Sequence, residues 1–385
     1  MLTQIKQLLL LLAALAVVAT GCGTKTVPST STMDSPEYHY TNGLKYLDNG
    51  QIDEALRSFD RAVALSPESP LGYIGKGLAF GKKGDFKAAF DNMEKAEDLE
   101  EKGIEARIGM IRLLSMQRGE DWITKAEKEF SKANDKEPNS ARLHYYMGIA
   151  YKMAFDFDKA AGLFRTVLDL NKDFTSEANT EWALIQKIQR AAPGSVIGKK
   201  IALIDKIDRA DVAALFDQEM NLEKLFTKRG TKTYDTSFKA PTEATASAMT
   251  TEKVVKMEAA TDIADHWLKP SIDTMIKLQV RGLEPGPNHA FEPDKLITKA
   301  EFALMLEDIL IKVSGDEKLA TKYIGATSLF PDVRSDHYAF NAAMTAASRG
   351  FLEADKATGE FNPGAPVSGA DALLSIRAFK DQLKF

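Results

Sequence analysis

Side chains able to do chemistry are few and widely spaced in this 385-residue chain. None of its histidines has the His-Glu-x-x-His spacing that places two zinc ligands on one helix face. Those histidines are His39, His144, His266, His289 and His337. No Gly-x-Ser-x-Gly nucleophile turn occurs, and the Gly81-Lys82 pair lacks the glycine spacing and the following Ser or Thr of a phosphate-binding loop. We therefore expect no enzyme, no metal and no cofactor.

The only thiol of the sequence belongs to Cys22. It follows an apolar run from Leu8 to Ala19, and Lys6 is the only charge before that run. The run is about a dozen residues long, which is too short for a spanning helix and typical of a signal-peptide core. Because a cysteine thiolate is a good nucleophile, Cys22 is placed where it could accept a lipid.

This N-terminus resembles a bacterial lipoprotein signal. The resemblance implies a signal peptide over residues 1–21, cleavage before Cys22, and attachment there of a diacylglycerol and an N-acyl chain such as palmitate. Gly23 rather than Asp follows Cys22, which in that family implies delivery to the outer membrane, facing the periplasm. An ordinary cleaved signal peptide and a short uncleaved anchor are the alternatives.

The bulk composition is that of a globular protein. The chain is 27% charged and 44% hydrophobic with a net charge of −5, and it lacks the basic balance of a nucleic-acid-binding domain. Once Cys22 carries lipid, no thiol remains for a disulfide or for thiol catalysis. Ser, Thr, Gly and Pro dominate residues 22–35, which predicts a flexible tether between the lipid and the folded body.

Small and aromatic residues recur at intervals of 34 residues after Pro36. Gly43, Tyr46, Ala55 and Phe59 are followed by Gly77, Phe80, Ala89 and Met93. This pattern resembles the tetratricopeptide repeat. The resemblance implies an all-α solenoid of helical hairpins, with four repeats over residues 36–174 and a capping helix over 175–194. The first helix of the third repeat, near 104–118, is degenerate, and its register stays open.

The repeat family implies a concave groove lined by the first helix of each hairpin. Carried over by register, the lining residues are Tyr40, Leu44, Leu47, Ile74, Leu78, Tyr145 and Ile149. They are apolar and aromatic, which favours a hydrophobic or amphipathic peptide of a protein partner. The alternatives are that a segment of this chain fills the groove, or that the groove packs on the C-terminal domain.

A second repeat, with an offset of about 70 residues, occupies the C-terminal part. Its first unit contains Asp262, His266-Trp267 and Phe291-x-Pro293, and its second contains Asp332, His337-Tyr338 and Phe361-x-Pro363. These units resemble S-layer homology repeats at 261–312 and 329–384. The stretch 208–211 resembles the end of a third copy. The resemblance implies a small helical domain over 195–385, with a mobile segment at about 228–260, that binds cell-wall polysaccharide or peptidoglycan.

The family's glycan cleft uses a Thr-Arg-Ala-Glu motif at a helix start. The candidate polymer-binding residues are Arg209, Asp211, Trp267, Lys299, Glu301 and Tyr338. The last copy has Gly369 where a base is expected. The alternative is a domain that keeps this fold without polysaccharide affinity. The helix caps and turns, which maintain the fold, match the family pattern better than the bases of the cleft do. Trp267 and Tyr338 could stack on sugars or could pack inward.

The parts together predict a non-enzymatic, lipid-anchored scaffold of the cell envelope. The lipid would anchor the chain in the membrane, the repeats would bind a protein partner, and the C-terminal domain would bind a cell-wall glycan. A tetratricopeptide lipoprotein that acts as an assembly or pilot factor for a secretion, pilus or outer-membrane machine is the alternative. In that case the repeats would be the working part.

Overall fold

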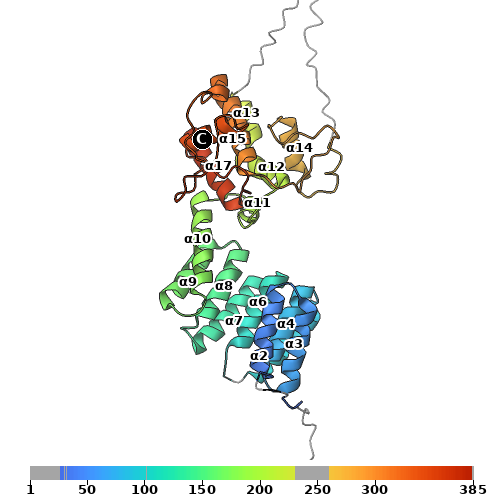
Figure 1. The fold of residues 1–385 in the computed structure, drawn as a ribbon. Coiled ribbons are helices and arrows are strands. Elements are labelled where there is room, and N and C mark those ends of the chain that lie inside the picture. Colours follow the sequence, from blue (N-terminus) through green and yellow to red (C-terminus); the bar gives the residue numbers. More distant parts are fainter. Residues whose placement is uncertain (1–26, 30, 32, 101, 230–259, 384–385) are drawn as a thin grey trace, which may run out of the picture. The chain divides into compact units, whose positions relative to one another are not determined.

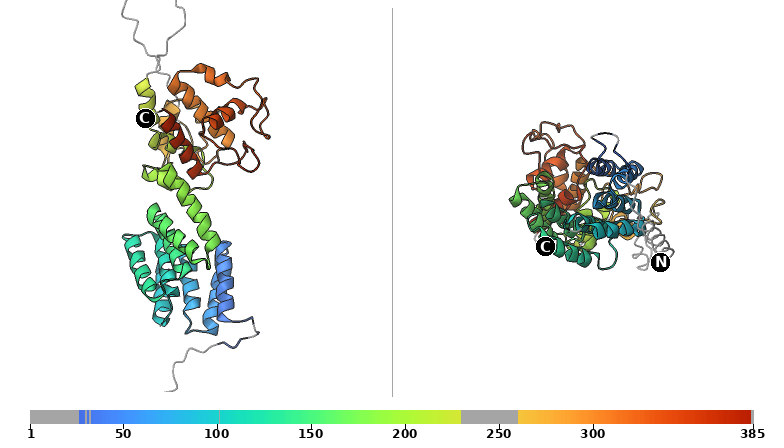
Figure 2. Two further views of the ribbon diagram at one scale, coloured as in Figure 1. Left: turned by 90° about the vertical axis from the view of Figure 1, so that its left-hand side faces the viewer. Right: turned by 90° about the horizontal axis from the view of Figure 1, so that it is seen from below.

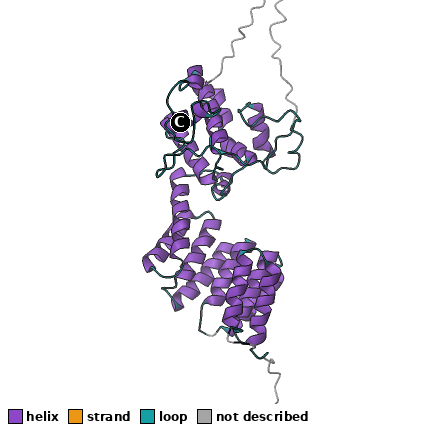
Figure 3. Cartoon of the chain, in the orientation of Figure 1, coloured by secondary structure: helices purple, strands orange, loops and turns teal. Residues whose placement is uncertain are grey.

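The computed structural model describes residues 27–29, 31, 33–100, 102–229 and 260–383. These residues form α-helices and one short 3-10 helix without any β-strand (Figures 1 and 3), which confirms the expected all-α class. They divide into two compact units, one ending at Trp182 and the other beginning at Ala183. None of the described helices is both long enough and apolar enough to span a bilayer. The expected signal peptide, Cys22 and most of the segment expected to be mobile lie outside the described residues.

The first unit is a series of antiparallel helical hairpins (Figures 1 and 2). Its helices are α2 (Pro36–Asp48), α3 (Ile52–Leu65), α4 (Pro70–Lys83), α5 (Phe86–Leu99), α6 (Glu105–Gln117), α7 (Trp122–Lys136), α8 (Ala141–Met153) and α9 (Phe157–Leu170). A longer helix, α10 (Thr175–Ala191), follows them. The first helices of the hairpins, α2, α4, α6 and α8, contact one another in that order.

Glycines on the first helices explain why the hairpins pack so closely. A Cβ atom on Gly43 would lie 2.4 Å from Cε1 of Phe59, and one on Gly75 would lie 2.1 Å from Cδ1 of the same ring. Phe59 is fully buried, so two neighbouring first helices press against one aromatic side chain. The fourth hairpin repeats the contact, because a Cβ on Gly148 would lie 2.7 Å from Cε1 of Phe164. Real Cβ atoms need more room than this, so only glycine fits.

The structure defines the register of the third hairpin, which the sequence left open. Its first helix, α6, is well formed although it carries little of the repeat signature. Ala126 occupies in the third hairpin the repeat position that Ala89 has in the second. The two residues are 37 positions apart instead of 34, and the extra residues lie after α6. The turn over 118–121 is two residues longer than the turn over 84–85, and Ala126 lies one residue further into its helix than Ala89 does. The insertion therefore leaves the register of α6 relative to α4 unchanged.

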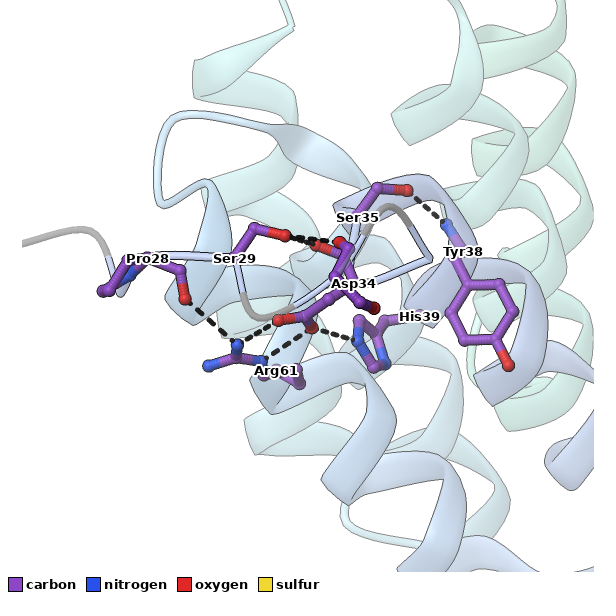
Figure 4. Close-up of polar contacts among 8 residues, drawn as sticks. Pro28, Ser29, Asp34, Ser35, Tyr38, His39 and Arg61 are labelled. Carbon is purple, nitrogen blue, oxygen red and sulfur yellow. Dashed lines mark hydrogen bonds and ion pairs between the residues drawn. The ribbon is translucent and has the colours of Figure 1, made fainter.

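The described part of the expected tether lies against the first hairpin. The backbone N–H of Val27 donates to the carbonyl of Ala64 at 2.9 Å. The buried carboxylate of Asp34 accepts hydrogen bonds from Nε of Arg61 at 3.0 Å and from the Nη2 group of the same side chain, and it lies 2.7 Å from Nε2 of His39 (Figure 4). Val27 and Asp34 thus make contacts with the first hairpin that a free spacer would lack.

After the end of α10, the second unit contains eight helical segments in its described part. They are α11 (Val196–Ile201), α12 (Arg209–Gln218), α13 (Leu222–Arg229), α14 (Lys269–Lys277), α15 (Lys299–Ser314), the 3-10 helix η1 (Glu317–Thr321), α16 (Phe340–Ser348) and α17 (Gly369–Leu383). Three of them, α12, α15 and α17, each begin directly after a residue whose side chain caps the helix. Asp208 and Thr298 each form a complete capping box. The hydroxyl of Ser368 likewise accepts from the N–H of Asp371 at 3.1 Å.

Three copies meet in a closed ring of backbone hydrogen bonds. The N–H of Ile207 donates to the carbonyl of Val367 at 2.9 Å, that of Val367 to Ile297 at 3.2 Å, and that of Ile297 to Ile207 at 3.1 Å. Each donor directly precedes a cap residue of one of the three helices. The first copy therefore takes its place in a threefold arrangement although its first half lacks the repeated pattern.

Candidate functional site

A hollow in the first unit is formed by the first helices of the four hairpins. It has about 350 Å³ of space, part of it open to solvent. Three of the expected groove residues line it, namely Tyr40, Leu44 and Ile74. Ile74 forms a buried floor, whereas Leu44 is partly exposed. The hollow thus draws on the concave-face positions that the repeat pattern indicated.

Four other expected groove residues lie elsewhere. Leu47 and Leu78 are core residues with exposures of 5% and 0%, so the expectation that they line a groove was wrong. Their positions face the second helices of the hairpins, where they pack with Phe59 and Met93. The remaining two, Tyr145 and Ile149, are half-buried and outside the hollow.

An aromatic cluster accounts for the position of Tyr145. Its ring stacks on Phe174 with a centroid distance of 4.9 Å and lies 6.0 Å from the ring of Phe164. Burial raises the pKa of Tyr145 to about 12. The neighbouring Tyr146 and Phe174 line the hollow instead.

The hollow contains two arginines that the expected apolar groove did not include. The Nη1 atom of Arg142 lies 2.9 Å from Oε2 of Glu105, which is also in the lining. The guanidinium of Arg112 lies 4.5 Å from the ring centroid of Tyr146, a cation–π distance. Arg112 forms no ion pair with any described residue, and the lining contains one carboxylate, that of Glu105, for two guanidinium groups.

The sequence does contain a signal for these residues. Ile108 and Arg112 lie 34 positions after Ile74 and Leu78, so continuing the period through the degenerate helix would have found them. Arg142 and Tyr146 precede Ile149 by seven and three positions, which puts them on the same stripe of α8. The sequence analysis did not continue the 34-residue period through α6, because the register of that helix was left open.

The hydroxyl of Tyr40 belongs to an uncharged part of the lining. A phenol is neutral at neutral pH, and burial raises the pKa of Tyr40 further, to about 12, against the lowering effect of Arg112. The phenol can donate a hydrogen bond. The formal charge of the lining is consequently set by Arg112, Arg142 and Glu105, and it is positive.

Arg209, the base expected to bind glycan in the first copy, forms hydrogen bonds within the second unit. Arg209 donates to three carbonyls of the following copy: Nε to Phe291 at 2.8 Å, Nη1 to Gly282 at 2.5 Å and Nη2 to Glu284 at 3.0 Å. Its guanidinium also lies 4.7 Å from the ring centroid of Phe291. This side chain joins the first copy to the second.

Lys299 has the same place between the second and third copies. Its Nζ atom donates to the carbonyl of Glu353 at 2.6 Å and lies 4.7 Å from the ring centroid of Phe361. At the third position a Cβ on Gly369 would lie 1.7 Å from the carbonyl oxygen of Ile201. The backbone of the first copy thus occupies the space of a third base.

Carboxylates surround both bases. Burial lowers the pKa of Lys299, and four acidic side chains oppose that effect: Asp371, Asp332, Asp355 and Glu353. Burial also lowers the pKa of Arg209, opposed by Glu292, Glu284, Glu301 and Asp262. An anionic glycan that approached either base would meet several negative charges, so these positions are poorly suited to bind one.

The expected acidic ligands of the glycan are helix caps. Asp211 completes the capping box of Asp208, and burial together with the Asp208 charge raises its pKa to about 6. The Oε2 atom of Glu301 accepts from the N–H and the hydroxyl of Thr298 at 2.9 and 2.8 Å. Their main contacts are therefore internal.

The two expected aromatic residues are exposed. Trp267 is 60% accessible and Tyr338 is 67% accessible, so neither follows the inward-packing alternative. The preceding histidines form local hydrogen bonds, because Nδ1 of His266 accepts from the N–H of Leu268 at 3.2 Å and Nδ1 of His337 from that of Ala339 at 3.2 Å. Both aromatic residues lie in the turn directly before a helix, α14 or α16.

Comparison with protein families identifies both repeat types. Residues 43–84 match the TPR repeat, and residues 329–373 match the S-layer homology domain. TPR repeats indicate a protein-interaction scaffold, and an S-layer homology domain indicates attachment at the cell surface.

Curated relatives are similar over part of their length. The chain is 28% identical over 113 residues to anaphase-promoting complex subunit 3 of Schizosaccharomyces pombe, covering 29% of this chain and 16% of that protein. It is 29% identical over 154 residues to tetratricopeptide repeat protein 13 of Homo sapiens, covering 39% and 17%. The chain thus spans about a sixth of the length of these relatives.

Solved structures of TPR proteins are also similar. One is a thermophilic TPR protein of Thermus thermophilus, with 18% identity, coverage of 50% of this chain and 96% of that one, and a TM-score of 0.35. Another is pilF of Pseudomonas aeruginosa, with 16% identity, coverage of 50% and 89%, and a TM-score of 0.33.

Proposed function

We propose that this chain, which carries a TPR repeat and an S-layer homology domain, is a non-enzymatic scaffold of the cell envelope. The hairpins of the first unit bind a protein partner, and the second unit contacts cell-wall glycan. The Cys22 lipid holds the N-terminus in the outer membrane, facing the periplasm. The observation that carries the proposal is the partly open hollow on the first helices, where a repeat scaffold presents its ligand face.

A photo-crosslinking side chain in place of Leu44 tests the protein-binding part. We expect it to capture a defined partner in intact cells, because Leu44 lines the hollow and is partly exposed. The same group in place of Arg165, an exposed position on α9, is the control. Equal capture from both positions would contradict a partner in the hollow.

Glycan contact through aromatic side chains is the proposed role of the second unit. Trp267 and Tyr338 offer large exposed faces at matching places in two copies, and such rings combine an apolar face with a polar tip. The bases and caps serve the fold instead. We expect the Trp267→Ala, Tyr338→Ala double variant of the full chain to lose co-sedimentation with purified sacculi. Leu296→Ala, at an exposed aliphatic residue, should keep it.

Membrane attachment through lipid rests on the N-terminal resemblance. A few buried acyl chains hold a folded body at a membrane without a spanning helix, since each CH₂ contributes roughly 0.8 kcal/mol. A Cys22→Ser chain should move from the membrane fraction to the soluble periplasmic fraction. Its retention in the outer-membrane fraction would contradict the lipid anchor.

The assembly or pilot role remains the second candidate. The crowding of Arg209 and Lys299 by carboxylates favours it, because weak glycan affinity would leave the hollow as the working surface. Under this candidate, the double aromatic variant keeps the cellular function and a hollow variant loses it. Under the first, both variants lose it.

A further inference from the structure

The exposed apolar side chains of the first unit gather at its N-terminal end. Among the described residues of that unit, every large hydrophobic side chain that is exposed lies between Val27 and Tyr38. Val27 is 43% accessible, Met33 is 62% and Tyr38 is 40%, and we call these three residues the N-terminal patch. Single exposed apolar residues scattered over a protein need no explanation, but exposed apolar residues confined to one place mark a contact surface.

Polar contacts hold the N-terminal patch at one end of the first hairpin. The N–H of Val27 donates to the carbonyl of Ala64, near the end of α3, at 2.9 Å. Nε of Arg61, on the same helix, donates to the carboxylate of Asp34, the residue directly after Met33, at 3.0 Å (Figure 4). The third patch residue lies in the first turn of α2. Since α2 and α3 are antiparallel, the beginning of α2 and the end of α3 lie at the same end of the hairpin.

The proposed lipid site is close to this patch along the chain. Val27 is only five positions after Cys22. A fully extended chain spans at most about 3.3–3.6 Å per residue, so a lipid on Cys22 would be attached within about 18 Å of Val27. A free tether over residues 22–35, as the sequence predicted, would reach about 50 Å before Pro36. The contacts of Val27 and Asp34 therefore shorten the distance that the first hairpin can move from the membrane.

We propose that the N-terminal patch contacts the surface of the membrane that holds the Cys22 lipid, and that the contact between Arg61 and Asp34 keeps it there. The short distance from the lipid supports this occupant. A tyrosine such as Tyr38 suits the headgroup region because its ring is apolar and its hydroxyl is polar. Arg61 and Asp34 form an ion pair, so their charges offset one another near the lipid. The inference rests on the proposed lipid anchor and adds a second membrane contact, made by the folded chain.

Fluorescence quenching on vesicles tests the proposal with the lipidated full chain. Cys22 is the only cysteine of the sequence, so a cysteine introduced elsewhere is the only free thiol once Cys22 carries lipid. Met33→Cys is labelled with nitrobenzoxadiazole and reconstituted into phosphatidylethanolamine–phosphatidylglycerol vesicles that contain lipids spin-labelled at the headgroup. Arg165→Cys, at an exposed position on α9, carries the same label as the control. We expect strong quenching of the label at position 33 and little at position 165.

Two arginine variants test whether the contact with Asp34 holds the patch at the membrane. In the Met33→Cys chain, Arg61→Gln should lower the quenching to the level of the control position, because the tether is then free to extend. Arg57→Gln removes an exposed guanidinium of the same helix that pairs with Glu54 at 2.7 Å, and should leave the quenching unchanged. Circular dichroism shows whether each variant is folded.

Vesicle flotation separates this inference from the lipid anchor. A chain that floats with the vesicles, but whose labels at positions 33 and 165 are quenched equally, would overturn the membrane contact and leave the anchor in place. Undiminished quenching in Arg61→Gln, or an equal loss in Arg57→Gln, would also overturn the proposal. A lipidated chain that does not float would overturn both the contact and the anchor.

Discussion

Closure of the threefold ring predicts that Gly369 cannot be enlarged. In a Gly369→Ala chain the new Cβ would lie 1.7 Å from the carbonyl oxygen of Ile201. Ordinary carbon–oxygen contacts are about 3.3–3.6 Å, so α17 and the first copy would have to separate by more than 1 Å. That movement also disrupts the 2.8 Å hydrogen bond from the N–H of Gly369 to the carbonyl of Ile204.

The cost can be worked out from these contacts. Overpacking of this kind costs about 1–3 kcal/mol, and a lost backbone hydrogen bond costs about 0.5–1.5 kcal/mol. Alanine recovers up to about 1 kcal/mol over glycine in a helix. A net loss of about 2 kcal/mol in the free energy of unfolding would lower the midpoint of a unit this size by roughly 4–8 °C.

Differential scanning calorimetry of the full chain is the appropriate assay, because it separates the transitions of two units. We expect the transition of the second unit to move and that of the first to stay. Gly364→Ala is the matched control, since no atom lies within 4 Å of a Cβ at that position. If Gly369→Ala and Gly364→Ala unfold at the same temperature, the proposed closure of the ring at Gly369 is incorrect.

Three further predictions concern packing, the N-terminal segment and a titrating cap. Gly43→Ala should destabilise the first unit by about 1–3 kcal/mol, whereas Gly162→Ala, which meets no neighbour, should stabilise it by up to about 1 kcal/mol; opposite signs in thermal unfolding are the check. Arg61→Gln should release Asp34 from the first hairpin and speed proteolysis of the chain before α2, and an unchanged cleavage rate would contradict the role of its contact with Asp34. The raised pKa of Asp211, about 6, means that the folded chain binds this proton more tightly than the unfolded chain, so its ionisation removes stability as pH rises from about 4 to 6. Asp211→Asn should therefore gain stability relative to the unmodified chain over that interval, and a constant difference in unfolding midpoint would contradict it.

Local contacts explain what the sequence predicted well. The 34-residue period identified the hairpins because glycines such as Gly43 and Gly148 each face a ring in the next helix. The caps at Asp208 and Thr298 are equally local, since a capping box spans four residues. Such features depend on near neighbours, so spacing alone reveals them.

Long-range packing explains what the sequence analysis missed. Leu47 and Leu78 lie near the groove stripe by count, but the neighbouring second helices bury them. The ring through Ile207, Ile297 and Val367 joins residues up to 160 positions apart, and each is an ordinary β-branched residue before a cap. No local pattern distinguishes these three from other core positions.

The contacts between copies indicate that the base of the repeated cleft motif stabilises the fold instead of binding glycan. A substitution of Arg209 tests this interpretation. Its three hydrogen bonds to carbonyls of the next copy, together with its contact with Phe291, make it a connector. Hydrogen bonds to a charged group are worth about 1.5–3 kcal/mol each, but the site is partly solvated, so we expect Arg209→Ala to cost roughly 2–4 kcal/mol of unfolding free energy.

The same variant should retain co-sedimentation with sacculi at temperatures where it stays folded, because the exposed Trp267 and Tyr338 are unchanged. A variant in those aromatics should show the reverse, with normal unfolding and lost sedimentation. Stability and wall binding would then separate onto different residues of one motif. If Arg209→Ala unfolds normally and loses sedimentation, the base is a glycan ligand, and its contacts with the carbonyls of Gly282 and Glu284 are incidental to stability.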